Sequence, residues 1–470
     1  MVFKKKLHKL NPDSQKPIPV TAQQTKRVKK KIVVTEQNNE RFIREMLARK
    51  VSGTHLGLWL LIPEYLRLGA WDLVCGLFNK PEDHNLSARI GLQLVNEAAI
   101  CQNRVRKRNA LCNQGFAPAN GLSFLVTDET IHDLLDCHTV AEYESLQVTL
   151  RQLRNLQGHY DPQNILAIDP HRIRSSTQRI MPKKKKRPSE PAHKMLQTLF
   201  CNDALTGQPL VFTIGSSGKS CSKATLQLLD LLKQSGVGKA LIMADKEHFT
   251  VDILNHIVDN TEMDLLLAVP NTKSVVQCFN SLDYKHLWAG YAIGQTDYKL
   301  KACPHPFKLI VQRTGEIPQR YSYKAFLSTV DNNNAVELLT EHYPKRWTIE
   351  EFFNFEGDMG WNRASTFNLN IRYGKQNLAL IAQAATHQLK NKLPDPYKQW
   401  TANHTATQIL TNMEGDLRVK DDTIIVTYYR DYLNLDIEKH YRNLPRILEQ
   451  EGINPKIPWL FDFKLDFRFK

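Results

Sequence analysis

Apolar residues recur at helical spacing in the first third of the chain, from about residue 39 to residue 158. In segments 42–51, 88–100 and 141–156, Leu, Ile and Val stand three or four positions apart, which places them on one face of a helix. Thr127, followed by two acidic residues, is typical of a capped helix start. We therefore predict a helical domain over residues 39–158.

The periodicity changes after residue 158, where short apolar runs alternate with amphipathic segments. The runs have the length of buried strands and end at turn residues, whereas the amphipathic segments are typical of helices. This alternation predicts an α/β core with a partly parallel sheet. The expected strands cover residues 164–170, 208–215, 238–245 and 263–270, and the expected helices cover residues 222–236 and 250–260.

Between residues 271 and 330 we see no helical periodicity, and three segments look like strands separated by turns. They predict a β-rich insertion, residues 271–330, within the α/β domain. Helical spacing returns afterwards, so we expect that domain to cover residues 159–393. The expected insertion strands are 287–300, 307–315 and 323–330, and the later helices are 333–353 and 374–393.

The two ends of the chain differ from these domains in composition. Residues 1–38 are rich in Lys, Gln, Pro and Thr, and they predict a flexible basic arm. Residues 394–470 contain one expected strand, 422–429, and an aromatic and basic end. We assign this C-terminal region to dimerisation or DNA contact.

Charge adds information about the partner. The chain has 63 Lys and Arg residues against 48 Asp and Glu residues, a net charge of +15. Such a surplus favours a polyanionic partner, most often nucleic acid, although a basic surface kept for solubility would have the same composition. The basic segment 102–110 lies in the helical domain, so we interpret that domain as DNA-binding.

Cysteines and apolar segments indicate the compartment. None of the 8 cysteines stands in a CxxC pair, which is typical of reduced thiols rather than a disulfide scaffold or a zinc site. The most apolar segment, 55–74, is interrupted by Pro63, Glu64 and Arg67, so it is too broken to span a membrane. These features predict a soluble, cytoplasmic protein.

Three acidic residues stand at positions suited to chemistry. Asp169 and Asp245 each end an expected strand of the α/β core, and Glu350 lies on the helix after the insertion. Side chains at adjacent strand ends can converge outside the sheet edge. Oxygen ligands without His or Cys suit Mg²⁺ or Mn²⁺. Each residue also has a simpler interpretation: a turn former before Pro170, a helix N-cap, and a solvated helix face.

Segment 341–353 is both highly charged and highly aromatic. On a helix, Tyr343, Arg346 and Glu350 share one face because they are three and four residues apart. Trp347, Ile349 and Phe353 would line another sector and bury against the sheet. The segment would then anchor in the core while presenting an acid, a base and a phenol to one site.

The set of motifs resembles the DDE transposases of bacterial insertion sequences. More narrowly, it is similar to the group in which Tyr, Arg, Glu and Lys recur at fixed spacing. The sequence YPKRWTIE supplies Tyr343, Arg346 and Glu350, while LAIDPH and LIMADKEHF resemble the strands of the first and second aspartates. The expected insertion also matches. The resemblance covers about residues 165–393, but the lysine of the pattern falls on Gly357, and Phe249 lies one position later than is common.

The resemblance implies a ribonuclease H-like core whose three carboxylates, Asp169, Asp245 and Glu350, are catalytic and hold two Mg²⁺ or Mn²⁺ ions. It implies an enzyme that cuts phosphodiester bonds at the ends of its own insertion sequence and joins the 3′-hydroxyl ends to target DNA. It also implies a homodimer on double-stranded DNA, with terminal inverted repeats as substrate.

Several basic and aromatic residues are candidates for DNA contact. Trp288, in the insertion, would stack on an unpaired base or pack in the core. Residues 182–188 form a basic cluster that would touch the DNA backbone, stay solvated or act as a nuclear import signal. The predicted DNA-binding residues are Tyr343, Lys345, Arg346, Trp288, Lys183, Lys184, Lys185, Lys186 and Arg187.

Two other functions remain open. A catalytically silent, DNA-binding descendant of a transposase would keep the fold without the activity. A phosphate-loop ATPase would use the segment IGSSGKS, residues 214–220, which follows an expected strand. That pattern requires a glycine five residues before Gly218, where Thr213 stands instead.

Overall fold

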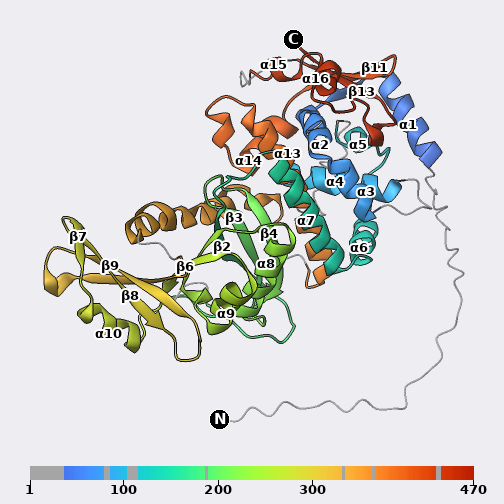
Figure 1. Cartoon of the computed structure of the whole chain (residues 1–470). Coiled ribbons are helices and arrows are strands. Elements are labelled where there is room, and N and C mark those ends of the chain that lie inside the picture. Colours follow the sequence, from blue (N-terminus) through green and yellow to red (C-terminus); the bar gives the residue numbers. More distant parts are fainter. Residues whose placement is uncertain are drawn as a thin grey trace, which may run out of the picture. The chain divides into compact units, whose positions relative to one another are not determined.

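The computed structural model describes residues 36–78, 85–102, 115–185, 189–330, 334–362, 366–429 and 436–470. Almost all of the predicted basic arm, and nearly all of the basic segment 102–110, lie outside these residues. Residues Glu36–Lys470 form one compact unit (Figure 1).

The N-terminal part of this unit is helical, as predicted. Side-chain caps begin two of its helices: Thr127 accepts a hydrogen bond from the Thr130 amide, and Thr139 forms a capping box with Glu142. The helices are α1 (Glu36–Ala48), α2 (Ile62–Leu68), α3 (Ala70–Phe78), α4 (Leu86–Ala99), α5 (Phe116–Ala119), α6 (Asp128–Asp136) and α7 (Val140–Leu156).

A mixed sheet of nine strands follows, in the order β4-β3-β2-β5-β6-β10-β9-β8-β7. The central strands β2, β5 and β6 are parallel to one another, and the other pairs are antiparallel. The strands are β2 (Ile165–Arg174), β3 (Met195–Asp203), β4 (Pro209–Ser216), β5 (Leu241–Ala244), β6 (Asp264–Val269), β7 (Lys285–Trp288), β8 (Tyr291–Lys299), β9 (Pro306–Thr314) and β10 (Ser322–Ser328). The predicted α/β class with a β-rich insertion and a helical N-terminal region is confirmed.

Two elements of this domain differ from the sequence-based expectations. Strand β3 was missed: all of its residues are buried, so its sequence does not alternate between polar and apolar. Within the insertion, the expectation of no helix was wrong, because α10 (Lys273–Ser281) begins at the Thr272 cap. That helix buries only Val275 and Phe279, too few residues to establish a helical period.

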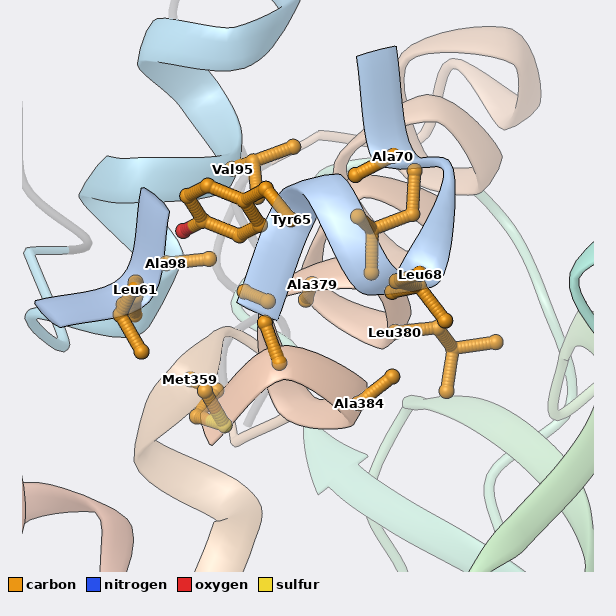
Figure 2. Packing of buried hydrophobic residues seen from close by; sticks show 14 of the residues in the cluster. Leu61, Tyr65, Leu68, Ala70, Val95, Ala98, Met359, Ala379, Leu380 and Ala384 are labelled. Atoms are coloured by element: carbon orange, nitrogen blue, oxygen red, sulfur yellow. The ribbon is translucent and has the colours of Figure 1, made fainter. Parts of the chain in front are cut away.

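Helices cover both faces of the sheet. On one face, α8 (Cys221–Gln234) and α9 (Val251–Asn260) pack against strand residues such as Ile168 and Leu199. On the other face, α12 (Thr348–Glu356) and α13 (Leu369–Asn391) pack against Ala167 and Phe200. Figure 2 shows α13 contributing Leu380 and Ala384 to a core with Tyr65 of α2 and Val95 of α4. The long helix α13 therefore joins the helical region to the sheet.

The C-terminal residues form a small sheet with the N-terminal region. Its order is β1-β11-β12-β13, in which β1 (Val51–Gly53) pairs with β11 (Gly415–Lys420). Figure 1 shows β11 and β13 close to the C-terminus. The other members are β12 (Thr423–Tyr428) and β13 (Lys464–Phe469), and the nearby helices are α14 (Ala402–Thr405), α15 (Glu438–Tyr441) and α16 (Leu444–Gln450). Trp459 and Phe467 are buried in this part, so they pack internally.

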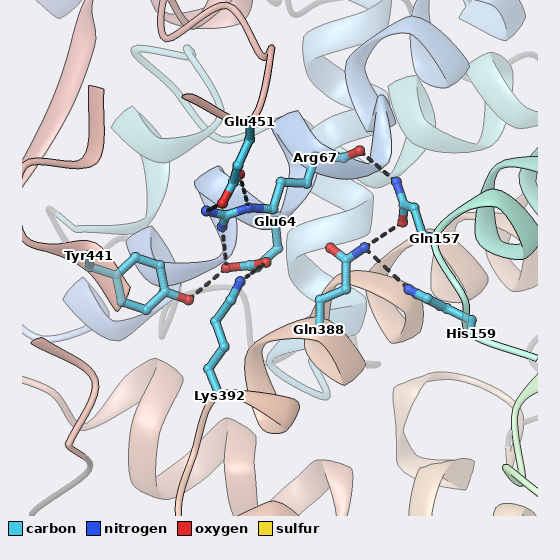
Figure 3. A network of polar contacts seen from close by, with 8 residues as sticks. All are labelled: Glu64, Arg67, Gln157, His159, Gln388, Lys392, Tyr441 and Glu451. Atoms are coloured by element: carbon cyan, nitrogen blue, oxygen red, sulfur yellow. Dashed lines mark hydrogen bonds and ion pairs between the residues drawn. The ribbon is translucent and has the colours of Figure 1, made fainter. Parts of the chain in front are cut away.

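A buried polar network also ties these segments together (Figure 3). Glu64 of α2 is fully buried and accepts hydrogen bonds from Lys392 at 2.5 Å and from Tyr441 at 2.7 Å. Arg67 connects the same carboxylate to Glu451. A buried carboxylate needs such partners, because leaving it unpaired would cost several kcal/mol, on the order of 3–5 kcal/mol. The predicted domain boundaries at residues 158 and 393 stay predictions.

Candidate catalytic site

Asp169 and Asp245 each follow the last residue that pairs between the neighbouring parallel strands β2 and β5. The prediction that the first strand ends at Asp169 was wrong, because β2 continues through Pro170 to Arg174 by pairing with β3. Strand β2 pairs with β5 so that Ile168 faces Ala244, and each aspartate is the next residue. Because parallel strands point the same way, both carboxylates lie at the same end of the sheet, beyond the carboxyl end of β5; we call this place the acidic edge. Asp245 also caps the short 3₁₀ turn Lys246–His248, with its Oδ1 accepting a hydrogen bond from the Lys246 amide at 2.7 Å. The structural role predicted for Asp245 and its place near Asp169 are therefore compatible.

Glu350 approaches this edge from the segment after β10. The predicted helix over residues 333–353 is helical from Ala335 onward, but it is not a regular α-helix: α11 (Ala335–Glu337) is followed by a π-helix, Leu338–His342, a 3₁₀ helix, Tyr343–Trp347, and then α12. Pro344 has no N–H for an α-helical hydrogen bond, which favours such a break. Arg346 still meets Glu350 four residues later, with its Nη2 at 3.3 Å from Glu350 Oε1.

Arg346 also reaches the first aspartate, because its Nη1 lies 3.9 Å from Asp169 Oδ1. The guanidinium therefore lies between carboxylates contributed by β2 and α12. Ile349 and Phe353 pack into the core as expected. Trp347 does not: it is 56% exposed, and the prediction of its burial was wrong.

Burial and neighbouring charges perturb Asp169 strongly. The side chain is 21% exposed. Burial raises the pKa of Asp169 to about 7, Arg346 opposes the rise, and the carboxylates of Glu247, Glu350 and Asp245 add to it. These carboxylates therefore interact electrostatically around Asp169. Such mutual repulsion is what a bound cation would relieve.

Tyr343 contacts the end of strand β5, next to Asp245. Its hydroxyl donates to the Ala244 carbonyl at 3.3 Å, and its ring packs edge-on against Phe326. Burial raises the pKa of Tyr343 to about 12, so the phenol stays protonated at neutral pH. Burial alone would lower the pKa of Arg346, but Tyr343 and the carboxylates outweigh this effect and raise it.

Sequence analysis missed a fourth carboxylate at this site, Glu247. It contributes to the raised pKa of Asp169 and forms an ion pair with Arg172 of β2 at 2.5 Å. Its position two residues after Asp245 was the available signal. Glu247 also belongs, with Cys221 and His248, to a group whose potential metal-ligand atoms all lie within 4.8 Å, the only such group of three found in the described part of the chain.

Asp169, Asp245 and Glu350 offer only oxygen ligands and lie farther apart than that group. Their carboxylate oxygens do not all lie within 4.8 Å of one another. Asp169, Asp245 and Glu350 are the residues that would hold a divalent cation at this site. Carboxylate oxygens are the ligands that Mg²⁺ prefers. The oxygen donors of these residues thus fit divalent cations, and Arg346 lies between Asp169 and Glu350.

Gly357, where the resemblance places a lysine, has no room for a side chain. A Cβ built there would lie 2.2 Å from the Asn362 amide nitrogen. Asn362 is in turn hydrogen-bonded to His171 Nε2 at 2.9 Å, and His171 packs on Phe353 at 4.5 Å between ring centroids. Gly357, which stands where the family pattern has a lysine, therefore leaves room for the hydrogen bond between Asn362 and His171.

The other predicted DNA-binding residues are distributed over several elements. Trp288 is 53% exposed and stacks on Tyr291 with ring centroids 4.3 Å apart. Lys345 is half-buried next to Arg346. In the basic cluster, the backbone of Lys184 pairs with that of His193, and Lys183 and Lys185 have exposed side chains. Lys186 and Arg187 lie outside the described residues.

The site thus combines an α/β domain with acidic residues next to the paired ends of its central parallel strands. Residues 160–382 match the family model described as Transposase DDE domain. Over these residues the chain is similar to transposase DDE domains, and the predicted resemblance to DDE transposases is confirmed. Such domains imply an enzyme that uses divalent metal ions.

A solved structure of the piggyBac transposase synaptic complex with hairpin DNA is also similar to this chain. It has 13% sequence identity and a TM-score of 0.41, over 75% of this chain and 80% of that chain. No curated protein sequence matches this chain. Across the described residues, none of the helices has the length and apolar character needed to cross a membrane.

Proposed function

We propose that this protein is a DNA transposase that cuts phosphodiester bonds at the ends of its own insertion sequence and joins the 3′-hydroxyl ends to target DNA. Asp169, Asp245 and Glu350 would be its catalytic carboxylates. The observation that carries the proposal is the pairing of Ile168 with Ala244, which brings the two aspartates to one edge, together with Arg346 between Asp169 and Glu350.

The three carboxylates would hold two Mg²⁺ ions, or Mn²⁺ ions, per site. When bound, the ions would supply Lewis acidity for an attacking oxygen and charge stabilisation for a leaving one. The chain's own contribution is positioning and charge. Arg346 has a planar set of N–H donors that suits a phosphate, and Tyr343 holds the arginine's segment against the end of β5.

DNA binding would use surfaces beyond the acidic edge. The net charge of +15 favours the phosphate backbone. Lys183 and Lys185 are exposed on the basic cluster, and Lys345 neighbours Arg346. Trp288 presents an exposed ring, backed by Tyr291, on which a base can stack. Double-stranded DNA with terminal inverted repeats would be the substrate, and a homodimer would bring two ends together. The cytoplasmic, nucleoid-associated location stays a prediction.

A metal-dependent strand-cutting assay tests the proposal. The substrate is DNA carrying the inverted repeats that bracket the coding region in the source genome. Asp245→Asn should lower cutting by about 10³-fold while leaving binding to the repeats intact. Asp252→Asn, which changes an exposed aspartate of α9, should cut normally. A wild-type protein that binds the repeats but cuts nothing with any divalent metal would favour the silent DNA-binding descendant instead.

A further inference from the structure

A hollow lies on the face of the sheet that α13 covers, which is also the face of Ala167 and Phe200. It has a volume of about 500 Å³ and lies where β3, β4 and the start of α13 meet the segment 179–182. Its wall is largely apolar, formed by side chains such as Leu196, Ile214 and Phe367. The charged residues that line it are Arg179, Lys219 and Arg372, and none of the lining residues that the structure describes is acidic.

Arg372 is the most constrained of these cations. It is 4% exposed, and its Nη1 donates to the Gly215 carbonyl at 3.4 Å. Its Nη2 is buried and has no hydrogen-bond partner among the residues that the structure describes. Burial lowers the pKa of Arg372 to about 10. A guanidinium held inside the protein with an open donor is costly unless an anion completes it.

Lys219 supplies a second positive charge. Its Nζ donates to Gln227, and burial lowers its pKa, although Glu144 opposes that shift. Glu144 is not a lining residue, and its carboxylate already accepts a hydrogen bond from Gln227 at 2.7 Å. Arg179 lies at the rim, with its guanidinium 5.4 Å from the centre of the Phe367 ring. The hollow therefore combines cations with apolar walls.

The loop Gly215–Lys219 belongs to the segment that resembled a phosphate loop, yet it does not present its amides to a ligand. The Ser217 amide donates to the Met195 carbonyl at 2.8 Å, and the Lys219 amide donates to the Ser216 carbonyl at 3.0 Å. The Gly218 amide donates to Ser216 Oγ at 3.2 Å. A phosphate loop needs such amides free, so any anion here would be held by side chains.

The pairing of β2 with β3 indicates how far this hollow lies from Asp169 along the strands. Asp169 pairs with Phe200, and Ile173 pairs with Leu196, so residues spaced by two or four along both strands face the same side. Leu196 lines the hollow and lies four residues from Phe200, or about 13 Å along the strand. A DNA strand rising about 3.4 Å per nucleotide would cross this distance in about four nucleotides.

We propose that this hollow binds a phosphate group of a DNA strand, with Arg372 and Lys219 as ligands and the neighbouring sugar or base against the apolar wall. The inference rests on the proposed function, because it takes the DNA cut at the acidic edge as the source of the phosphate. A free mononucleotide carries the same chemistry and is the other source that the experiment distinguishes.

The test measures binding of a short, fluorescently labelled, 5′-phosphorylated single-stranded oligonucleotide to the full chain without divalent metal, so that no strand is cut. Lys219→Gln should weaken binding by roughly 5- to 20-fold and reduce the slope of log affinity against log salt by about 1. Lys223→Gln changes an exposed lysine in the first turn of α8, just after Lys219, and should bind as the wild type does. Arg372→Gln keeps a donor for Gly215 and should weaken binding similarly, with thermal unfolding confirming that it folds.

Unlabelled deoxyadenosine monophosphate identifies the source. If it competes only weakly, the site takes a phosphate of a DNA strand. If it competes as well as the oligonucleotide, the site still takes a phosphate, but from a free nucleotide. Wild-type affinity and an unchanged salt slope in folded Lys219→Gln and Arg372→Gln would overturn the proposal. Because cutting is not measured, failure of the proposed catalytic function would appear separately, in the Asp245→Asn assay.

Discussion

The guanidinium of Arg346 lies 3.9 Å from the carboxylate of Asp169, yet the pKa of Asp169 is still raised to about 7. Burial of the aspartate and the nearby acids outweigh the attraction of the arginine. The ionised form of Asp169 is therefore unfavourable in the folded protein. Carboxylates with a raised pKa are common where a protein binds a cation or performs chemistry.

Cation binding should therefore depend on pH. A cation needs ionised Asp169, so the affinity for Mg²⁺ or Mn²⁺ should rise as pH increases to about 7 and then level off, with proton release below that value. Calorimetric titration in two buffers of different ionisation enthalpy measures both effects. An affinity that is constant between about pH 6 and about pH 8 would contradict this assignment of Asp169.

The same charge should cost stability. Because the folded-state pKa is raised, the stabilising contribution of protonated Asp169 is fully present below the unfolded value near 3.8 and is lost as pH rises through about 7. Without metal at about pH 8, Asp169→Asn should therefore raise the free energy of unfolding by about 1–2 kcal/mol. Chemical denaturation measures this difference, and at about pH 4 the gain should disappear. A destabilised variant at the higher pH would show that the contact with Arg346 dominates.

Two adjacent glutamates provide a matched comparison on α12. Glu350 contacts Arg346, whereas Glu351 is exposed. Glu350→Gln should lower metal-dependent cutting by about 10²- to 10³-fold, and Glu351→Gln should leave it within about 2-fold of wild type. Single-turnover cutting of a repeat-containing DNA gives both rates. Equal losses in the two variants would mean that the contact with Arg346 does not mark the catalytic acid.

Arg346 should matter through its geometry as well as its charge. Arg346→Lys keeps the charge but cannot reach two carboxylates or a phosphate with paired donors, so cutting should fall by about 10-fold or more. Arg346→Gln should lose about 10²-fold and also raise the pKa of Asp169 further, moving the pH dependence of cutting upward. Rates measured across pH test this, with Lys439→Gln, an exposed C-terminal lysine, as the control. An unchanged pH profile would argue against the Arg346–Asp169 coupling.

The contact between His171 and Asn362 should explain the glycine at residue 357. Gly357→Ala would force Asn362 away from His171 and should cost about 1–2 kcal/mol of unfolding free energy. Asn362→Ala alone should cost a similar amount, and the double variant should cost less than the sum. Denaturant unfolding of the four proteins completes this cycle. Additive losses would show that the two positions are independent.

Some of this protein could be predicted from local patterns. Helical spacing predicted α7 and α9, and short apolar runs predicted β4 and β6, because each element reflects the period of its own residues. The motif spacing around Tyr343, Arg346 and Glu350 also predicted that the last two would meet, since residues four apart on a helical segment are neighbours.

Other features depended on contacts between distant segments. Strand β3 has no alternation because both of its faces are buried, and Glu247 joins the acidic cluster only through the turn after β5. Pairing of β1 with β11 links residues that are far apart in the chain, which no local pattern encodes.

The sequence by itself determined the class of the domain, the candidate acids and the positive charge, because composition and short-range periodicity are properties of the chain alone. Only the tertiary structure decided that Arg346 lies between Asp169 and Glu350, that Trp347 is exposed, and that Arg372 and Lys219 line one hollow. These outcomes depend on how packing brings separate elements together, and burial then sets the charge of each group.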